Sequence, residues 1–320
     1  MIISLVIFYA KWCLYWEEDV NALLPLKLYL GCSGWSYTSW QGPFYPPEIE
    51  NKAWLPYYSQ IFNYVEIDST FYNIPSELMV TNWNRRTPDN FRFTAKFPKI
   101  ITHEKKFKNV QKDLELFYER MEPLKDKLLA LLIQLPPSYK LKEGLEDFSS
   151  YNFFFEGDFR YAVEVRHSSW FSDLAYNFFK NNNIVMVWSQ MDRLKTPPIV
   201  TSDFVYLRLI GDRRLAEEQF GEIQIDRTEE IRNWANRMKY VTQNEKDVKI
   251  GIVAANNHYG GYGPGTVDIF LQNMDMGKLT LENVDIAKIN RDMQMETTSN
   301  FSDRKQSKKG KQTSISDFVN

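Results

Sequence analysis

The sequence predicts an α/β fold, a single TIM-like (β/α)8 barrel with a disordered C-terminal tail. First, short apolar stretches typical of buried strands alternate with amphipathic helical stretches from Leu28 onward. Second, several of these stretches end in charged or amide side chains, as expected where barrel strands deliver functional groups at their C-terminal ends. The chain of 320 residues, 43% hydrophobic and 25% charged, is long enough for one large barrel.

Eight strands are expected in chain order, each apolar enough to be covered on both faces. They are Leu28–Cys32, Tyr64–Asp68, Arg92–Phe97, Leu128–Leu135, Tyr161–Arg166, Ile184–Trp188, Phe204–Leu209 and Lys249–Ala255. Helical periodicity lies between most of them, for example over Val110–Met121 and Thr228–Val241. The barrel is therefore predicted to span residues 28–275.

The flanking segments differ in composition from the barrel. Residues 1–27 form an N-terminal extension of uncertain structure, whose apolar run Met1–Ala10 is too short to span a bilayer and lacks the features of a signal peptide. Residues 276–311 have the composition of a polar linker, followed by a short C-terminal peptide at 312–319. No membrane segment is expected. Cys13 and Cys32 have neither disulfide-framework nor metal-site spacing, which favours a reducing, cytoplasmic location.

The fifth expected strand carries two charges in a covered position. Glu164 and Arg166 alternate with Val163 and Val165, so they share one face of the strand. Buried charges are costly unless they are paired or used. The pair is therefore either structural or part of a functional site.

Polar residues also end most of the other strands. Because the C-terminal strand ends of a barrel meet in one hollow, called the bowl below, this favours a functional site there over a purely structural set of buried polar side chains. The candidate catalytic residues are Glu66, Lys96, Glu164 and His167. The candidate substrate-binding residues are Trp35, Tyr37, Tyr72, Gln134, Arg166, Arg208, Asn256 and Asn257.

Seven ordered motifs lie between about Leu28 and Met274. They are Gly31–Tyr37, Phe44–Pro46, Val65–Tyr72, Phe93–Pro98 with Ile101–His103, Gln134–Ser138, Glu164–His167 with Trp170, and Asn256–His258. Together they resemble the YecE-like family, the domain of unknown function seventy-two. The resemblance implies a TIM-like barrel but brings no established reaction. The similarity of that family's barrel to endonuclease IV suggests nucleic-acid binding, by analogy of fold alone.

Two chemistries compete for the bowl. Lys96, Arg166 and Arg208 can clamp a phosphate while aromatic residues stack on splayed bases, with Glu66 or Glu164 as general base. The same aromatics and the two carboxylates also suit a glycosidase. Large rings are often packed in the core, so some of these aromatics have a structural role only. A net charge of −2 gives no global basic field, so nucleic acid would have to meet a local patch.

The three histidines of the chain each follow a different strand end. His103, His167 and His258, with Glu66 and Glu164, are candidate ligands for a divalent metal such as zinc or manganese. The alternative is that they form hydrogen bonds in a polar site. Three histidines are too few for the trinuclear zinc site of endonuclease IV.

The C-terminal peptide resembles the PCNA-interacting peptide (PIP box), which tethers replication and repair proteins to the sliding clamp. Gln312 is followed by Ile315 three positions on and by Phe318 six positions on, and Val319 stands where a second aromatic is usual. One 3₁₀ turn would place Ile315 and Phe318 on one side as a plug for a groove on the clamp. The alternative is a frayed tail whose apolar residues pack on the barrel.

Together these features predict a barrel that acts on DNA or RNA, tethered to the PCNA clamp. A hydrolase of phosphodiesters or damaged nucleotides in DNA repair or replication is the class they favour. The residues leave open whether the protein is an enzyme. The alternatives are a glycosidase-like hydrolase and a non-catalytic nucleic-acid-binding barrel.

Overall fold

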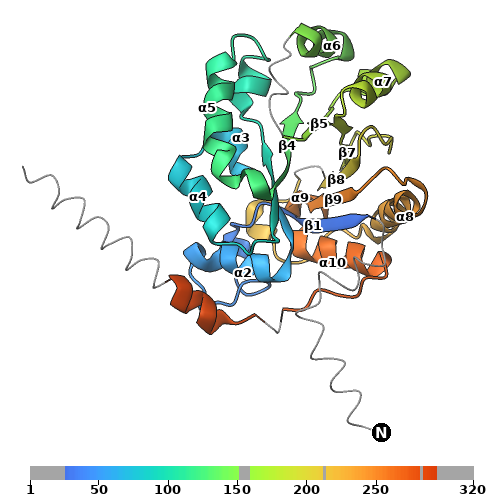
Figure 1. The fold of residues 1–320 in the computed structure, drawn as a ribbon. Helices are drawn as coiled ribbons and strands as arrows, with labels where there is room; N and C mark the ends of the chain where they lie inside the picture. The colour runs from blue at the N-terminus through green and yellow to red at the C-terminus, as the bar shows by residue number, and fades with distance from the viewer. Residues whose placement is uncertain (1–25, 151–158, 212–213, 282–283, 294–320) are drawn as a thin grey trace, which may run out of the picture.

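The computed structural model describes residues 26–150, 159–211, 214–281 and 284–293, and within them a parallel sheet curls into a near-closed barrel (Figure 1). The strand order in the sheet is β6-β5-β4-β3-β2-β1-β9-β8-β7. The strands are β1 (Lys27–Ser33), β2 (Tyr64–Ile67), β3 (Arg92–Lys96), β4 (Leu128–Gln134), β5 (Tyr161–Glu164), β6 (Val185–Met186), β7 (Trp188–Met191), β8 (Phe204–Gly211) and β9 (Ile250–Ala255). The predicted α/β barrel is confirmed.

The barrel closes through a single interrupted strand. β6 and β7 occupy the two ends of the sheet order, yet only Val187 separates them along the chain. β6 pairs with β5, while β7 pairs with β8. The stretch expected as one strand, Ile184–Trp188, is therefore split, and it links both edges of the sheet.

Helices surround the strands (Figure 1). They are α2 (Trp54–Ile61), α3 (Ser69–Tyr72), α4 (Glu77–Arg85), α5 (Gln111–Met121), α6 (Leu141–Ser150), α7 (Asp173–Asn181), α8 (Thr228–Asn244), α9 (Asn257–Gly260) and α10 (Gly263–Asn273). Short 3₁₀ turns are η1 (Thr38–Trp40), η2 (Asn51–Ala53), η4 (Glu122–Lys127), η6 (Ser168–Trp170) and η7 (Glu217–Gln219), and η3 (Ile100–Glu104) is a π-helix.

Local sequence explains where these helices lie. α8 buries Ile231, Trp234, Met238 and Val241, whose spacing of three and four residues gives one apolar face toward the barrel. Ser76 caps α4, because its hydroxyl accepts a hydrogen bond from the backbone N–H of Met79 at 3.3 Å. The two helical stretches expected at 110–121 and 228–241 correspond to α5 and α8.

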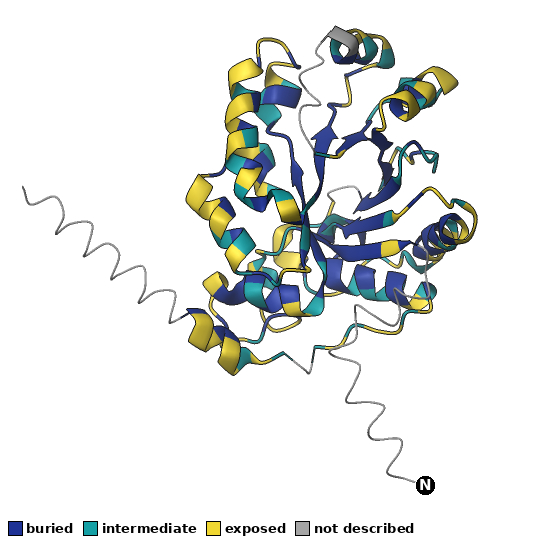
Figure 2. Ribbon diagram, in the orientation of Figure 1, coloured by how far each residue is buried: buried dark blue, intermediate teal, exposed yellow. Residues whose placement is uncertain are grey.

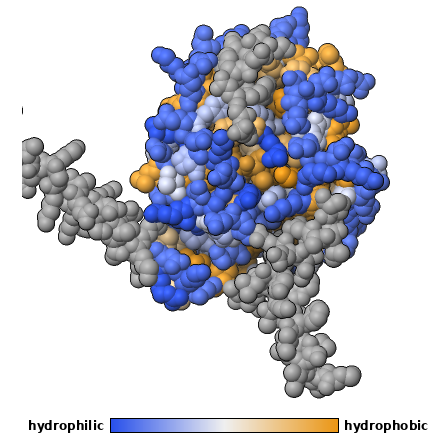
Figure 3. Space-filling model, in the orientation of Figure 1, coloured by the Kyte–Doolittle hydropathy of each residue, from blue (hydrophilic) through white to orange (hydrophobic). Residues whose placement is uncertain are grey.

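The hydrophobic core has two parts, separated by the sheet. The larger part lies between strands and helices, and the smaller part fills the barrel interior with Tyr29, Tyr64, Leu132, Tyr206 and Ile252 among others. Figure 2 shows the strands buried and the outward faces of the helices exposed. Figure 3 shows a face that is mostly hydrophilic, with hydrophobic residues between. None of the described helices is long and apolar enough to cross a membrane.

The segment predicted as a polar linker from residue 276 is folded in its first part. Residues 286–293 are helical, and Ile289 and Met293 are buried, only 6% and 5% exposed. These two apolar residues lie four apart, so they face the same side of that helix. Residues 1–25 and 294–320, which include the predicted clamp-binding residues Gln312, Ile315, Phe318 and Val319, lie outside the described residues.

Candidate functional site

The register of the parallel strands brings polar side chains together at the C-terminal end of the barrel. Ser33 on β1 is level with Glu66 on β2, and Gln134 on β4 is level with Glu164 on β5. Partners level in a parallel sheet direct their side chains to the same face. Glu66 and Glu164 both contact Arg208 of β8, so this face is the barrel interior.

Arg208 is the centre of the network. Its Nε donates to Glu66 Oε2 at 2.7 Å, and one terminal nitrogen donates to Glu66 Oε1 at 2.6 Å. The other terminal nitrogen donates to Glu164 Oε2. Arg208 is 1% exposed, and the two glutamates are 0% exposed. Such a bidentate arginine holds its carboxylates in fixed geometry.

Two tyrosines of the barrel interior, Tyr64 and Tyr206, extend this hydrogen-bond network. Tyr206 donates its hydroxyl to Glu66 Oε2. The Tyr206 hydroxyl also lies 2.8 Å from that of Tyr64 and 2.9 Å from Thr94 Oγ1. Glu66 thereby receives hydrogen bonds from both a tyrosine and an arginine, so its oxygens are well satisfied although they are buried.

Burial would raise the pKa of both glutamates, but the neighbouring cations prevail. Arg208 and Lys96 hold the pKa of Glu66 well below its ordinary range. Arg208 and Arg166 lower the pKa of Glu164 in the same way. Both glutamates are therefore anions at neutral pH.

A second ion pair lies closer to solvent. Lys96 Nζ is 2.7 Å from Asp68 Oδ1 and 3.4 Å from Glu66 Oε1. The side chain of Asp68 is 25% exposed, whereas that of Lys96 is 9% exposed. Burial of its carboxyl, and then the charge of Glu66, raise the pKa of Asp68 to about 6, against the opposing effect of Lys96. Asp68 is thus able to exchange a proton near neutral pH.

Arg166 completes the network on the far side of Glu164. Its Nε donates to Glu164 Oε1 at 2.7 Å, and its terminal nitrogen donates to Gln134 Oε1 at 2.9 Å. The side chain is 17% exposed. Three carboxylates thus meet three cations in the bowl, so its charges balance when Asp68 is ionised.

The structure brings together the predicted residues Glu66, Lys96, Gln134, Glu164, Arg166 and Arg208. The roles expected for some of them change. Arg208 was expected to contact substrate, but two buried carboxylates bind it and solvent does not reach it. Glu66 and Glu164 were expected to be catalytic; both are fully buried and ion-paired, Glu66 with Arg208 and Lys96 and Glu164 with Arg208 and Arg166.

Asp68 and Tyr206 were missed among the candidate residues. Asp68 was present in the Glu66–Tyr72 motif and follows Glu66 by two, so strand alternation directs both to the bowl. Tyr206 precedes Arg208 by the same spacing. The period-two pattern was the signal that could have identified both.

The predicted aromatic residues are exposed or half-buried. Tyr72 is 58% exposed, and Trp35 and Tyr37 are half-buried near the strand ends. Trp35 packs edge-on against Trp83, with ring centroids 5.9 Å apart. Tyr37 donates its hydroxyl to the carbonyl oxygen of Ser33 at 2.7 Å.

The two asparagines after β9 hold the following turn. Asn256 Oδ1 accepts from the backbone N–H of His258 at 3.0 Å. Asn257 Oδ1 accepts from Trp40 Nε1 at 3.1 Å and from the backbone N–H of Gly263 at 2.8 Å. Asn257 is buried, so at least half of its amide has a structural role.

The histidines do not form the predicted metal site. Within residues 26–150, 159–211, 214–281 and 284–293, no three His, Cys, Asp or Glu side chains are grouped so that they could hold a metal ion. His103 Nδ1 lies 2.8 Å from Thr102 Oγ1, His167 Nδ1 lies 2.9 Å from Ser169 Oγ, and the His258 ring packs edge-on against Phe220. The catalytic role expected for His167 stays a prediction.

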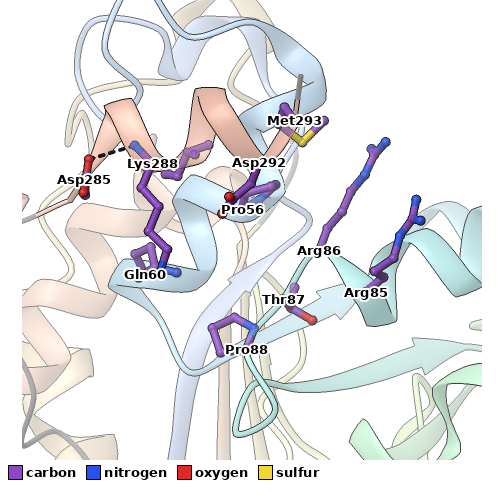
Figure 4. A pocket seen from close by; sticks show the side chains of 11 residues that line it. Pro56, Gln60, Arg85, Arg86, Thr87, Pro88, Asp285, Lys288, Asp292 and Met293 are labelled. Carbon is purple, nitrogen blue, oxygen red and sulfur yellow. Dashed lines mark hydrogen bonds between the residues drawn. The ribbon is translucent and has the colours of Figure 1, made fainter. Parts of the chain in front are cut away.

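A cavity of about 430 Å³ lies elsewhere (Figure 4). It is lined by Pro56, Gln60, Arg85, Arg86, Thr87, Pro88, Asp285, Lys288, Ile289, Asp292 and Met293. Gln60 lies in the last turn of α2, which leads into β2, and Pro88 lies in the loop before β3, so the cavity is at the N-terminal end of the barrel. Functional sites of these barrels lie at the opposite end, where the ion-pair network is found.

Comparison with known proteins places the chain in a family. The family described as "Protein of unknown function DUF72" matches residues 29–288. The chain belongs to the DUF72 family. This agrees with the resemblance of its sequence motifs, and the family description names no reaction.

Two curated relatives agree with this assignment. The chain is similar to UPF0759 protein YecE of Escherichia coli (strain K12), 31% identical over 145 residues, covering 45% of this chain and 50% of that protein. It is also similar to UPF0759 protein YunF of Bacillus subtilis (strain 168), 28% identical over 155 residues, covering 47% of this chain and 54% of that one. The match spans about half the length of these relatives.

Crystal structures of DUF72 proteins share the barrel. One from Thermotoga maritima MSB8 has a TM-score of 0.67 and 29% identity, covering 78% of this chain and 99% of that one. One from Enterococcus faecalis V583 has a TM-score of 0.64 and 22% identity, covering 81% and 100% of the two chains, and shows the fold alone.

Proposed function

We propose that this DUF72 barrel acts on nucleic acid, binding phosphate and processing a phosphodiester or nucleotide in DNA repair or replication. The observation that carries the proposal is the Asp68–Lys96 pair with Arg166 on the solvent side of the network. Arg208, Lys96 and Arg166 together balance Glu66, Glu164 and Asp68, and of these groups Asp68, Lys96 and Arg166 are the ones that solvent reaches.

Lys96 and Arg166 are recessed cations suited to a phosphate that enters the bowl. Their side chains are only 9% and 17% exposed, so they meet a group that inserts between the strand ends. An intact duplex presents no such group, whereas a single strand or a flipped nucleotide does. Tyr72, Trp35 and Tyr37, in the loops that follow β1 and β2, offer surfaces on which bases stack.

Asp68 supplies the proton chemistry in this proposal. A general acid or base works best when its pKa is near the working pH, and the pKa of Asp68 is raised to about 6. Its ionised form accepts a proton from an attacking water, and its protonated form donates one to a leaving oxygen. Lys96, 2.7 Å away, stabilises charge that develops beside it.

The glycosidase alternative has weaker support. A glycosidase needs one protonated carboxylic acid and a second, free carboxylate on either side of the scissile bond. Glu66 and Glu164 are both ionised, buried and bound to Arg208. Asp68 would have to act without an accessible partner.

Binding and turnover separate the proposed function from its alternatives. Full-length protein is titrated by fluorescence anisotropy with single-stranded DNA, RNA, duplex DNA and a set of oligosaccharides at several salt concentrations. We expect binding to single strands that weakens with salt and weakens further in Lys96→Met, because phosphate contacts release counterions. Lys249→Ala is the matched control, since Lys249 immediately precedes β9 and lies at the opposite end of the barrel.

The outcomes assign the class of protein. Binding with phosphodiester or nucleotide turnover that disappears in Asp68→Asn supports the enzyme. Binding without turnover leaves a nucleic-acid-binding barrel. Binding of oligosaccharides alone refutes the nucleic-acid proposal in favour of the glycosidase.

We further propose that residues 312–319 tether the protein to the PCNA sliding clamp, which would place it in the cytoplasm with the replicated DNA. Support comes from Gln312, Ile315 and Phe318 at the spacing of a PIP box. Residues 294–311 join that peptide to the folded unit, and 18 residues extend at most about 60 Å. Met293 is at the N-terminal end of the barrel, so the bowl faces away from the root of the tether.

A peptide of residues 305–320 tests the tether directly by calorimetric titration against the clamp of the source organism. We expect micromolar binding, weaker than that of a peptide in which Val319→Phe restores the second aromatic. The double change Ile315→Ala with Phe318→Ala removes the hydrophobic plug and should abolish binding. Equal binding of the wild-type and doubly changed peptides would rule out the PIP-box mechanism.

A further inference from the structure

The loop that joins β3 to α5, residues 97–110, brings positive charge to the bowl end of the barrel. Together with the first turn of α5, residues 99–113 hold five lysines and two carboxylates, a net charge of +3 in a chain whose net charge is −2. Because the loop follows β3, it lies at the C-terminal end of the barrel. A protein without a global basic field meets nucleic acid through a local patch of this kind.

Two of these lysines are paired within the fold, and two lysines of the loop are not. Lys99 Nζ lies 3.3 Å from Glu104 Oε1, and Lys105 Nζ lies 2.6 Å from Asp113 Oδ2. Lys106 and Lys108 are exposed, and neither forms an ion pair with another residue in the described part of the chain. Their charges are therefore available to a partner.

The backbone around these two lysines is held in an unusual conformation. Lys106, Phe107 and Asn109 have φ angles of 47°, 64° and 55°, in the left-handed region that residues other than glycine rarely adopt. Phe107 is buried, and its ring centroid lies 5.6 Å from that of Tyr139 and 5.4 Å from that of Phe148. Strained backbone persists only where its surroundings hold it in place. Phe107 thus anchors the loop between its two exposed lysines.

The loop passes close to the cations of the bowl. Burial, and then the charge of Arg166, lower the pKa of His103, so the imidazole lies within electrostatic reach of that guanidinium. Three residues of chain extend at most about 11 Å, and five extend at most about 18 Å. The Cα atoms of Lys106 and Lys108 therefore lie within those distances of the Cα atom of His103.

An exposed aromatic ring lies near the same loop. The ring of His103 packs edge-on against Phe71, with centroids 5.0 Å apart, and Phe71 packs edge-on against Tyr72 at 5.4 Å. Tyr72 is 58% exposed. Cations beside an exposed ring are typical of single-strand binding, because the cations meet phosphates while the ring stacks on a base. An acidic peptide would be matched by the charges alone.

We propose that Lys106 and Lys108 bind phosphates of a single strand of nucleic acid outside the bowl, while one nucleotide of that strand occupies the bowl. This rests on the proposed function and extends it, because it gives the strand a path over the β3–α5 loop beside Tyr72. The anchored loop presents the two ammonium groups without the cost of ordering a flexible segment on binding. The binding site is then longer than one nucleotide, and affinity increases with strand length.

Ligand length separates the loop from the bowl in the test. The full chain is titrated with thymidine 5′-monophosphate by calorimetry and with a fluorescent twelve-nucleotide oligothymidylate by anisotropy, at several salt concentrations. The variant Lys106→Gln with Lys108→Gln removes both charges of the loop. Lys246→Gln with Lys249→Gln is the matched control, because it removes two exposed charges just before β9, at the opposite end of the barrel.

We expect the wild type to bind the oligonucleotide more tightly than the monophosphate. The loop variant should bind the oligonucleotide about tenfold more weakly, and the slope of log affinity against log salt should fall by about 1.4, because each phosphate contact on a single strand contributes about 0.7. Its binding of the monophosphate should be unchanged, whereas Lys96→Met should weaken binding of both ligands. The control variant should behave as the wild type, and thermal unfolding should be the same for both double variants because their substituted side chains are exposed.

Three results would overturn the loop surface. One is an oligonucleotide affinity and salt slope that the loop variant shares with the control variant. Another is a wild-type affinity that does not increase from the monophosphate to the oligonucleotide. The third is displacement of the oligonucleotide by polyglutamate of equal charge as effectively as by unlabelled oligonucleotide, which would make the loop a site for acidic protein chains.

The same measurements keep the two proposals apart. A wild type that binds the oligonucleotide with no contribution from Lys106 and Lys108 leaves the nucleic-acid function standing without the loop surface. A wild type that binds neither the monophosphate nor the oligonucleotide removes the nucleic-acid function, and the loop surface with it.

Discussion

At the scale of the residue, the bowl contains two kinds of carboxylate. Glu66 and Glu164 are buried, and bound arginine keeps them ionised. Asp68 is partly exposed, and its pKa is raised to about 6. The same side-chain chemistry thus serves structure in one place and proton exchange in another, because the surroundings separate the pKa values.

Asp68 should make ligand binding depend on pH. Below about pH 6 it is protonated and the bowl gains one net positive charge, so anionic oligonucleotide should bind about tenfold more tightly at pH 5 than at pH 7.5. Asp68→Asn, neutral at both values, should bind tightly throughout. Anisotropy titrations between pH 5 and pH 7.5 measure the effect. If binding by Asp68→Asn depends on pH as strongly as binding by the wild type does, the prediction is contradicted.

The same group should affect stability with the opposite sign from an ordinary ion pair. Folding raises the pKa of Asp68 from its ordinary value of 3.8 to about 6. The native state therefore holds this proton more tightly than the unfolded chain does. That contribution to stability is complete below pH 3.8 and is lost as the pH rises through 6. Chemical unfolding between pH 4 and pH 7 should therefore show a loss of stability that is smaller in Asp68→Asn. An equal loss in both proteins would mean that other groups dominate.

Arg208 should contribute to folding rather than to ligand contact. Arg208→Met leaves Glu66 and Glu164 buried without their main counter-charge, and breaking a buried pair in this way costs about 3–5 kcal/mol. Urea unfolding should show this loss, while Arg232→Met, on the exposed face of α8, should change stability little. A stable Arg208→Met protein that fails only in binding would restore the phosphate-clamp interpretation.

At the scale of the element, the shortest strand among the described residues is β6, which lies where the barrel closes. β6 has only two residues, and the side chain of Thr201 supplements its pairing. Thr201 Oγ1 accepts from the backbone N–H of Met186 and donates to the carbonyl oxygen of Ile184, both at 2.8 Å. One hydroxyl thus satisfies two backbone groups of a strand that lacks a longer partner.

Replacing Thr201 by Val should test this closure, because the change keeps shape but removes the hydroxyl. Two buried backbone groups lose their partner, and the free energy of unfolding should fall by about 2–4 kcal/mol. Hydrogen exchange should increase at Met186 and not in β2. Ser202→Ala, at the half-buried neighbouring position, is the control. A Thr201→Val protein as stable as that control would show that water replaces the hydroxyl.

At the scale of the whole molecule, the ends of the barrel have separate tasks. The C-terminal end carries the ion-pair network, and the N-terminal end receives residues 286–293 through Ile289 and Met293. This arrangement leaves the chain beyond Met293 starting from the end opposite to the bowl. Under the proposed tether to the clamp, the bowl would therefore stay clear for substrate.

Two truncations should separate folding from tethering. Removal of residues 294–320 should leave thermal stability unchanged and abolish clamp binding. Removal of residues 285–320 also exposes the surface beneath Ile289 and Met293, and burial of each such side chain contributes about 1.5–3 kcal/mol. The longer truncation should therefore lower the melting temperature as well. Equal stability of the two truncated proteins would mean that the 286–293 helix contributes nothing to the barrel.

The sequence alone determined the barrel, most of its strand positions and the face that carries the polar residues, but not the division of the stretch Ile184–Trp188 between β6 and β7. These depend on local information, because strand alternation and helical spacing show which side chains are buried and where each strand ends. For the same reason Glu164 could be assigned to one face of a strand, whereas β5 ends at Glu164 and Arg166 follows it. Apolar periodicity predicted α5 to within one residue of its start, and it predicted α8 with the correct start but an end three residues early.

The tertiary structure alone decided which of these residues are free to act. Arg208 is 142 residues from Glu66 and 44 from Glu164 along the chain. No local sequence pattern predicts that both glutamates bind Arg208 and that solvent does not reach it. Trp40 and Trp170 are fully buried, whereas Tyr72 is exposed, although all three follow strand ends. The raised pKa of Asp68 likewise depends on Glu66 and on burial. Charge pairing and desolvation arise from neighbours that are distant in sequence, so they appear only when the barrel closes.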